Sequence, residues 1–303
     1  MKKKEIKNLP ASVWAKLLSI AKSQNVEPMM ILKRYMQERF LFRLGQSPYR
    51  DKLILKGALM LVAHQLPLHR PTKDVDLLGE GFTNDPEGLK QIISEIAVIK
   101  SKDGVTFKLD EMEVERITED DRYAGLRTKL PARLGKIKDI LQIDTGFGDI
   151  IIPNPVALDY PVILNNENPH VYAYSLESAI AEKFEAMVSL GEFNSRMKDF
   201  FDIHFLALVK TFDSQLLRQA IEATFTQRQT KLDQRKNLWR EDFRADAGRQ
   251  TMWTAFLNTN KLSAPADFAE VVNRIAEFIE PALTTTDVKN WNPHKWTWYR
   301  QST

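Results

Sequence analysis

The sequence contains no cysteine in its 303 residues, so it offers neither disulfide bonds nor thiolate metal ligands. Its five histidines are scattered and never take the HExxH spacing, which argues against a zinc site. No apolar run reaches the roughly 18 residues that a membrane span needs. The basic N-terminus leads into an amphipathic segment instead of an apolar signal core. We therefore expect a soluble, cytoplasmic protein that does not contact a membrane.

Three familiar nucleotide and hydrolase motifs are also missing, namely the Walker P-loop, G-x-G-x-x-G and G-x-S-x-G. What the chain does have is a hydrophobic content of 43%, which is enough for a sizeable core. Its length suits one large domain or two ordinary ones. A formal charge of +3 and a pI near 8.8 permit contact with nucleic acid without demonstrating it.

The first half of the chain mixes helical and strand patterns. Apolar periodicity and helix-start residues predict helices at residues 12–22, 28–40, 59–64 and 86–96. Alternating or short apolar runs predict strands at residues 53–55, 73–78, 105–109, 112–117, 123–130 and 137–144. Gly57 allows a tight turn between the first strand and the short helix that follows it.

The second half is expected to be helical nearly to its end. Residues 153–168 are rich in proline and asparagine, and Ser175 is a good helix N-cap after them. One helix should end at Gly191, and another should cover residues 196–210. We therefore place one domain at residues 1–168 and a helical C-terminal domain at residues 169–303. The predicted fold class is α/β (α+β), with a mixed sheet core and an N-terminal helical lead-in.

Two aspartates two positions apart, Asp74 and Asp76, form the most informative feature. On a strand they share one face, while Val75 and Leu77 point to the other. Two carboxylates on one face repel each other unless a cation lies between them, and hard oxygen ligands at this spacing suit Mg²⁺. A D-x-D pair also arises by chance at a solvated strand end, so the pair alone leaves both interpretations open.

A third carboxylate, Asp144, ends a later alternating strand. Aspartate at a strand end often only begins a turn. Beside the first two acids, however, it would allow two cations to bind, one on the triphosphate and one on the attacking hydroxyl.

Lys183 and Asp199 lie on the two helices after Ser175. The positions one turn from Lys183 are Ala179, Ile180, Ala186 and Met187, so its own helix supplies no acid. It is either an ordinary surface lysine or one that can reach a phosphate. Asp199 is either part of a helix-start ion-pair cluster or the group that orients Lys183 or a substrate hydroxyl.

A basic stretch in the C-terminal half is either a solvated helix face or a phosphate-tracking surface for RNA. Its members are Arg228, Lys231, Arg235, Lys236, Arg240, Arg244 and Arg249, with Trp239 and Phe243 between them.

Together these segments resemble the nucleotidyltransferase AbiEii/AbiGii toxin family, MenT-like, of type IV toxin–antitoxin systems. The resemblance rests on five ordered segments at Leu55–Leu59, Arg70–Leu77, Ile143–Asp149, Ala181–Ala186 and Arg196–Ile203. They are similar to the family's LKGGTAL turn, its R-x-T-x-D-[ILV]-D-L strand, its D-[IV]-x-x-G-D segment, and its A-E-K-[LF]-x-A and R-x-[RK]-D-x-x-D-[LI] helices. Gly57-Ala58 departs from the usual Gly-Gly or Gly-Ser, because Ala58 has no hydroxyl for a phosphate.

The resemblance implies a nucleotidyltransferase-like core that uses Mg²⁺. Asp74 and Asp76 would hold the metal, Lys183 the triphosphate, and Asp199 would be a further essential acid. Nucleotide contacts are implied for Lys56, Gly57, Ala58, Thr72 and Lys73. Members of the family are toxins, and some add nucleotides from an NTP to the 3′ end of tRNA. An NTP, an RNA acceptor and a separate antitoxin protein are therefore the expected partners.

Two other functions stay open at this point. A kinase-like enzyme or a nuclease could use the same acidic metal site. A non-catalytic nucleotide- or RNA-binding protein could retain a decayed version of it.

Overall fold

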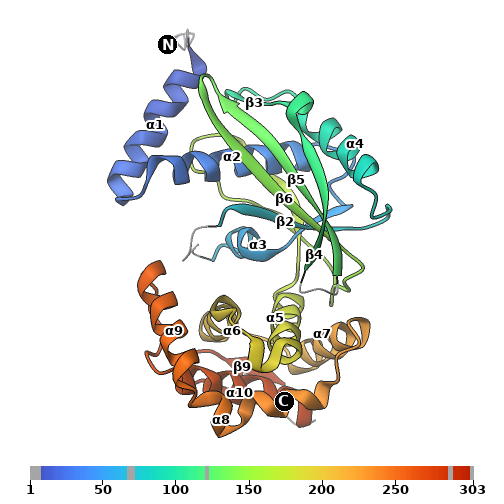
Figure 1. The fold of residues 1–303 in the computed structure, drawn as a ribbon, viewed down its shortest axis with the longest axis vertical. Coiled ribbons are helices and arrows are strands. Elements are labelled where there is room, and N and C mark those ends of the chain that lie inside the picture. Colours follow the sequence, from blue (N-terminus) through green and yellow to red (C-terminus); the bar gives the residue numbers. More distant parts are fainter. Residues whose placement is uncertain (1–7, 67–71, 120–122, 286–288, 301–303) are drawn as a thin grey trace. The chain divides into compact units, whose positions relative to one another are not determined.

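The computed structural model describes residues 8–66, 72–119, 123–285 and 289–300 (Figure 1). Two compact units make up the chain. The first comprises residues 1–148 and 156–173, and the second comprises residues 149–155 and 174–303. The domain boundary placed after residue 168 falls shortly before the strand with which the first unit ends. Arg70 and Pro71, which belong to the predicted R-x-T-x-D-[ILV]-D-L segment, lie outside the described residues.

The first unit contains helices and a mixed sheet. Its helices are α1 (Leu9–Gln24), α2 (Pro28–Gly45), α3 (Gly57–Ala63), α4 (Pro86–Ala97) and the 3₁₀ turn η1 (Leu109–Glu111). Its strands are β1 (Leu53–Leu55), β2 (Asp74–Gly79), β3 (Val105–Phe107), β4 (Glu113–Glu119), β5 (Tyr123–Leu134), β6 (Ile137–Phe147), β7 (Val156–Asp159) and β8 (His170–Ala173).

The strands of this sheet lie in the order β3-β5-β6-β2-β1-β8-β7, and β4 also pairs with β5. β2 runs parallel to β6 and β1 runs parallel to β8, whereas the other neighbouring strands of this sheet are antiparallel. β5 and β6 form a long hairpin, visible in green in Figure 1. The parallel β2–β6 pair sets Asp76 directly opposite Asp144.

One face of the sheet is apolar and covered by helices. Val75 and Leu77 of β2 have no exposed surface, and Ile143 of β6 is equally buried. Helix α2 lies on this face, because Lys33 bonds to Asp139, which alternation puts on the same side of β6 as Ile143. The half-buried Asp74 and Asp76 therefore project from the opposite face.

The second unit is mostly helical. Its elements are α5 (Leu176–Leu190), η2 (Gly191–Phe193), α6 (Met197–Val209), α7 (Ser214–Gln227), η3 (Leu232–Trp239), α8 (Glu241–Arg244), α9 (Ala247–Asn260), α10 (Phe268–Thr284), β9 (Asn290–Asn292) and β10 (Thr297–Tyr299). Ser175 caps α5 by accepting a hydrogen bond from the Ser178 N–H, as predicted. α5 ends at Leu190, where Gly191 takes a φ of 50°.

The C-terminal part is helical up to Thr284, and two details go beyond what the sequence pattern specifies. The basic stretch begins at the end of α7 and continues through the 3₁₀ segment η3 and the one-turn helix α8. The tryptophan-rich tail forms the hairpin β9–β10, in which Trp291 is fully buried and packs on Phe278 with ring centroids 4.9 Å apart. The expected mixed α/β fold class, with a helical lead-in and a helical C-terminal part, is confirmed. None of the described helices is both long enough and apolar enough to cross a membrane.

Candidate active site

The turn between β1 and α3 is fitted closely to Asp76. Gly57 has a φ of +62°, and a Cβ atom built on it would lie 1.9 Å from Oδ2 of Asp76. The backbone N–H of Lys56 donates to the Asp76 carbonyl oxygen at 2.8 Å. Ala58 is buried in α3. The glycine turn after β1 therefore lies directly against Asp76 of the acidic strand β2.

Backbone contacts hold the start of β2 in place. Gln37 of α2 donates weakly to the carbonyl oxygens of Thr72 and Asp74, at 3.4 and 3.5 Å. The Thr72 hydroxyl donates to the Asp74 carbonyl oxygen at 3.4 Å, and Lys73 is exposed. The two acids therefore project from a strand that is fixed at its beginning by a buried glutamine.

Asp144 is not open to a metal ion in the way that the sequence suggests. Arg127 of β5 donates to both of its carboxylate oxygens, Nε to Oδ1 at 2.9 Å and an Nη to Oδ2 at 2.8 Å. Gln142 adds a third bond to Oδ2 at 3.3 Å. Sequence reasoning missed Arg127, because the pairing of β5 with β6 depends on a register that local patterns do not reveal.

The donor set nevertheless fits one divalent cation. No cluster of three or more histidine, cysteine, aspartate or glutamate side chains arranged for a metal was found within the described segments. Mg²⁺ usually takes only one or two carboxylates and completes its shell with water and substrate phosphates. Asp74 and Asp76 supply two such carboxylates on one face, beside a backbone turn that has no Cβ in the way.

A second group of charged residues lies in the helical unit. Nζ of Lys183 on α5 contacts Asp199 at 3.1 Å and Asp202 at 2.7 Å, both on α6. Lys183 therefore has acidic partners, although its own helix provides none. The sequence signal for this was only the i, i+3 spacing of the two aspartates, which does not say what they face.

Asp199 is almost completely buried and lies between two positively charged side chains, those of Lys183 and Arg196. Arg196 approaches its second oxygen at 2.8 Å as an ion pair that lacks hydrogen-bond geometry. Burial raises the pKa of Asp199, but the charges of Lys183, Arg196 and Lys198 outweigh it and leave the pKa below its ordinary value. Asp199 is therefore an ionised group that fixes Lys183.

A third network, absent from the sequence predictions, surrounds Arg228. Its guanidinium contacts Asp149 at 2.9 Å, Glu185 at 3.0 Å and Glu182 at 3.5 Å. Burial lowers the pKa of Arg228, yet the nearby acids more than compensate and raise it. Arg228 stabilises the interior of the second unit and is not part of an open basic face.

Other arginines of the basic stretch are engaged in the same way. Arg235 pairs with Glu280 at 2.8 Å, and Arg240 and Arg244 bond to Asp242 and Asn273. The continuous phosphate-tracking surface considered for this stretch is therefore interrupted, because most of its charges already face acids or amides. Lys231, Lys236 and Arg240 are exposed, although Lys236 lies 3.6 Å from Asp233 and Arg240 pairs with Asp242.

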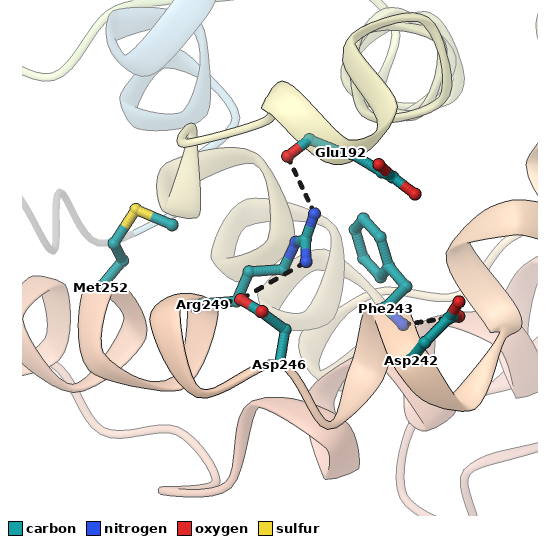
Figure 2. A pocket seen from close by; sticks show the side chains of 6 residues that line it. All are labelled: Glu192, Asp242, Phe243, Asp246, Arg249 and Met252. Carbon is teal, nitrogen blue, oxygen red and sulfur yellow. Dashed lines mark hydrogen bonds and ion pairs between the residues drawn. The ribbon is translucent and has the colours of Figure 1, made fainter.

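A pocket of about 380 Å³ lies elsewhere in the second unit (Figure 2). It is lined by Glu192, Asp242, Phe243, Asp246, Arg249 and Met252. Figure 2 shows Arg249 bonded to the Glu192 carbonyl oxygen and beside Asp246. Three carboxylates and an arginine that is already paired suit a triphosphate poorly. None of the residues predicted to bind the metal or the nucleotide lines this pocket, although Phe243 and Arg249 belong to the basic stretch.

Comparisons with known proteins identify the family of this chain. A family model described as "Nucleotidyl transferase AbiEii toxin, Type IV TA system" matches residues 39–274, well over half of the chain. No curated protein sequence matches significantly.

Solved structures share the fold at low sequence identity. MenT4, a nucleotidyltransferase toxin from Mycobacterium tuberculosis H37Rv, is 15% identical with a TM-score of 0.50, covering 90% of this chain and 97% of its own. JHP933 from Helicobacter pylori is also 15% identical with a TM-score of 0.50, covering 85% of this chain and 94% of its own. At this identity the structures support the fold, and the family model supports the activity. The chain belongs to the AbiEii family of nucleotidyltransferase toxins.

Proposed function

We propose that this nucleotidyltransferase is Mg²⁺-dependent and transfers a nucleotide from an NTP to an acceptor hydroxyl, with the 3′ end of an RNA such as tRNA as the acceptor. The observation that carries the proposal is the pair Asp74 and Asp76 on one face of β2, fitted against the Gly57 turn. A divalent cation bound there neutralises the charge that develops on the phosphates.

The residues of this chain have distinct parts in the reaction. Asp74 and Asp76 bind the cation, and the turn residues Lys56 to Ala58 with Thr72 and Lys73 contact the nucleotide. Lys183 binds the triphosphate through its ammonium group. The acceptor oxygen attacks the α-phosphorus, the bond to the β-phosphate breaks, pyrophosphate leaves, and the hydroxyl proton passes to solvent.

Asp199 acts in this proposal as a positioning residue. Its two oxygens face Lys183 and Arg196, and it is 1% exposed, so a substrate hydroxyl has no ready access to it. It holds the Lys183 ammonium group in one position, which favours this role over that of a general base.

The biological setting follows from the family. Its description places the family in type IV toxin–antitoxin systems, so we propose a cytoplasmic toxin with a separate antitoxin protein as its counterpart. The net charge of +3 is compatible with an RNA acceptor.

Incubation with total RNA and each α-labelled NTP in turn tests the proposal. Label in RNA, lost on addition of a chelator and in the Asp76→Asn variant, is the expected result. Asp85→Asn, which alters an N-cap of α4 in the same unit, is the matched control and should keep its activity. Transfer of γ-label to any acceptor would instead indicate a kinase, and RNA shortening a nuclease.

A further inference from the structure

Arg127 occupies a row of charged residues that crosses the sheet. Asp76, Asp144 and Arg127 are directly paired positions on β2, β6 and β5, and Glu115 of β4 is paired with Arg127. Cross-strand partners point to the same face, so all four side chains rise beside the proposed cation site. The row contains one arginine among three acids.

The paired hydrogen bonds from Arg127 to Asp144, which we call the fork, use only part of the guanidinium. Nε and Nη2 donate to Asp144, and within the described residues Nη1 of Arg127 has no hydrogen-bond partner. The arginine side chain is 33% exposed. A planar guanidinium with one edge fixed by a carboxylate and another edge open is suited to bind a phosphate oxygen.

The charge of Arg127 is permanent and acts on the acid pair as well. The hydrogen bonds and charge of Asp144, together with the charge of Asp74, raise the pKa of Arg127. A second divalent cation on Asp144 would have to approach this guanidinium, which already takes both carboxylate oxygens. In two-metal sites the second cation stabilises the attacking or leaving oxygen.

We propose that Arg127 takes the place of a second metal ion, so that the site binds a single divalent cation at Asp74 and Asp76 while Nη1 of Arg127 binds a phosphate of the nucleotide. Asp144 is then a positioning residue that aims the guanidinium. The inference rests on the proposed function, because it assumes the nucleotide and the first cation.

Counting bound Mn²⁺ tests the proposal without any turnover. The protein is titrated with Mn²⁺ in the presence of the α,β-methylene analogue of each ribonucleoside triphosphate in turn, and electron paramagnetic resonance separates bound from free ion. One Mn²⁺ per chain in the presence of the bound analogue is expected. Two ions per chain would overturn the role of Arg127 while leaving the nucleotidyltransferase site intact. Absence of any Mn²⁺ or analogue binding would overturn both.

Variants on β5 provide a matched comparison. Arg127→Gln should weaken binding of the analogue at least tenfold. Lys129→Gln removes a positive charge from the same strand face, where it pairs with Glu115 at 2.9 Å, and should change binding less than twofold. Equal losses of analogue affinity in both variants would show that only the positive charge matters, and not the position of Arg127, and would contradict the proposal.

Two further variants guard against misfolding. Arg127→Lys keeps the charge but loses the fork, so the stoichiometry should stay at one Mn²⁺ and affinity should fall three- to tenfold. Asp144→Asn keeps the size of the side chain but loses the carboxylate that orients the Arg127 guanidinium. It should weaken binding of the analogue to a similar degree. Wild-type affinity in both would contradict a phosphate contact that depends on the fork.

Discussion

A Cβ atom on Gly57 would lie 1.9 Å from Oδ2 of Asp76, which is closer than any real contact permits. The same glycine has a φ of +62°, in the left-handed region that side chains disfavour. Backbone conformation and local space therefore both require glycine here. The position of the Asp76 carboxylate depends on the turn that precedes α3.

Gly57→Ala should separate these two requirements when it is compared with Gly81→Ala. Gly81 has a φ of +74°, but a Cβ there would meet nothing within 4 Å. Both variants carry the backbone cost of roughly 1–2 kcal/mol. Only Gly57→Ala displaces Asp76, so calorimetry should show Mg²⁺–NTP affinity falling at least tenfold in that variant and unchanged in Gly81→Ala. Equal affinities would mean that the turn does not support the cation site.

Asp199→Asn should destabilise the second unit and loosen Lys183. Removing one partner of a buried ion pair typically costs about 3–5 kcal/mol. We expect a loss near the lower end in urea unfolding, because Arg196 keeps 25% of its side chain exposed and can be hydrated. Asp233→Asn, at a side chain that is 88% exposed, should change stability by no more than about 0.5 kcal/mol.

A double-mutant cycle then isolates the contact itself. If Asp199 stabilises Lys183, the combination Lys183→Met with Asp199→Asn should lose less than the sum of the single losses, by about 1 kcal/mol or more. Additive losses would show that Asp199 acts on Arg196 alone.

The sequence revealed those features of the site that depend on short-range geometry. The spacing of Asp74 and Asp76 determines a shared face on any strand, and Ser175 caps a helix through a bond only three residues long. Gly57 followed by a short helix predicted the turn. Each of these depends on backbone periodicity, which the local sequence controls.

Contacts between distant segments were beyond the reach of local patterns. Lys183 lacks acids on its own helix, and only the packing of α5 on α6 brings Asp199 and Asp202 to it. Arg127 was visible only as a polar residue on an alternating strand, since a shift of one residue in the β5–β6 register would send it to the other face. The pairing of Arg228 and Arg235 in the basic stretch was hidden for the same reason, because Asp149 and Glu280, their acidic partners, lie far away in sequence.

Glu38 should make the first unit less stable as the pH rises. It is fully buried, and burial raises its pKa from 4.5 to about 7, although Arg39 at 2.9 Å and the Ile163 N–H act in the opposite direction. The folded state thus holds a proton that the unfolded state releases. The resulting stability is complete below pH 4.5 and is lost as the pH rises through 7, by about 3 kcal/mol at most.

Glu38→Gln removes this titration and keeps an oxygen for the Ile163 N–H. As the pH rises from 4.5 to 7.5, its unfolding free energy in urea, followed by circular dichroism, should therefore fall relative to the wild type's by less, so that the variant's free energy minus the wild type's increases. Glu27→Gln, at an exposed position before α2, is the matched control and should retain the wild-type slope. A Glu38→Gln profile parallel to the wild type would contradict a protonated Glu38.

His204 should have the opposite effect in the second unit. Burial, and then the charge of Arg274, lowers its pKa from 6.5 to about 4, while Glu270 opposes the shift. Its ring packs on Trp296 with centroids 5.3 Å apart, and Nε2 has no hydrogen-bond partner among the described residues. The unfolded state now binds the extra proton, so stability present above pH 6.5 is lost as the pH falls toward 4, by about 3 kcal/mol at most.

His204→Phe keeps an aromatic ring against Trp296 and removes the titration. Tryptophan fluorescence reports mainly on the second unit, which holds Trp239, Trp253, Trp291, Trp296 and Trp298 of the six tryptophans. Followed in this way in urea, the variant should lose less stability than the wild type between pH 6.5 and 4.5, whereas His294→Gln at an exposed turn should follow the wild type. Because Glu38 and His204 act with opposite signs over the same pH range, the wild-type chain can show a nearly flat profile even though both groups titrate. The two titrations therefore become visible only when the profile of each variant is compared with that of the wild type. Identical profiles for His204→Phe and the wild type would show that His204 is not held neutral by burial.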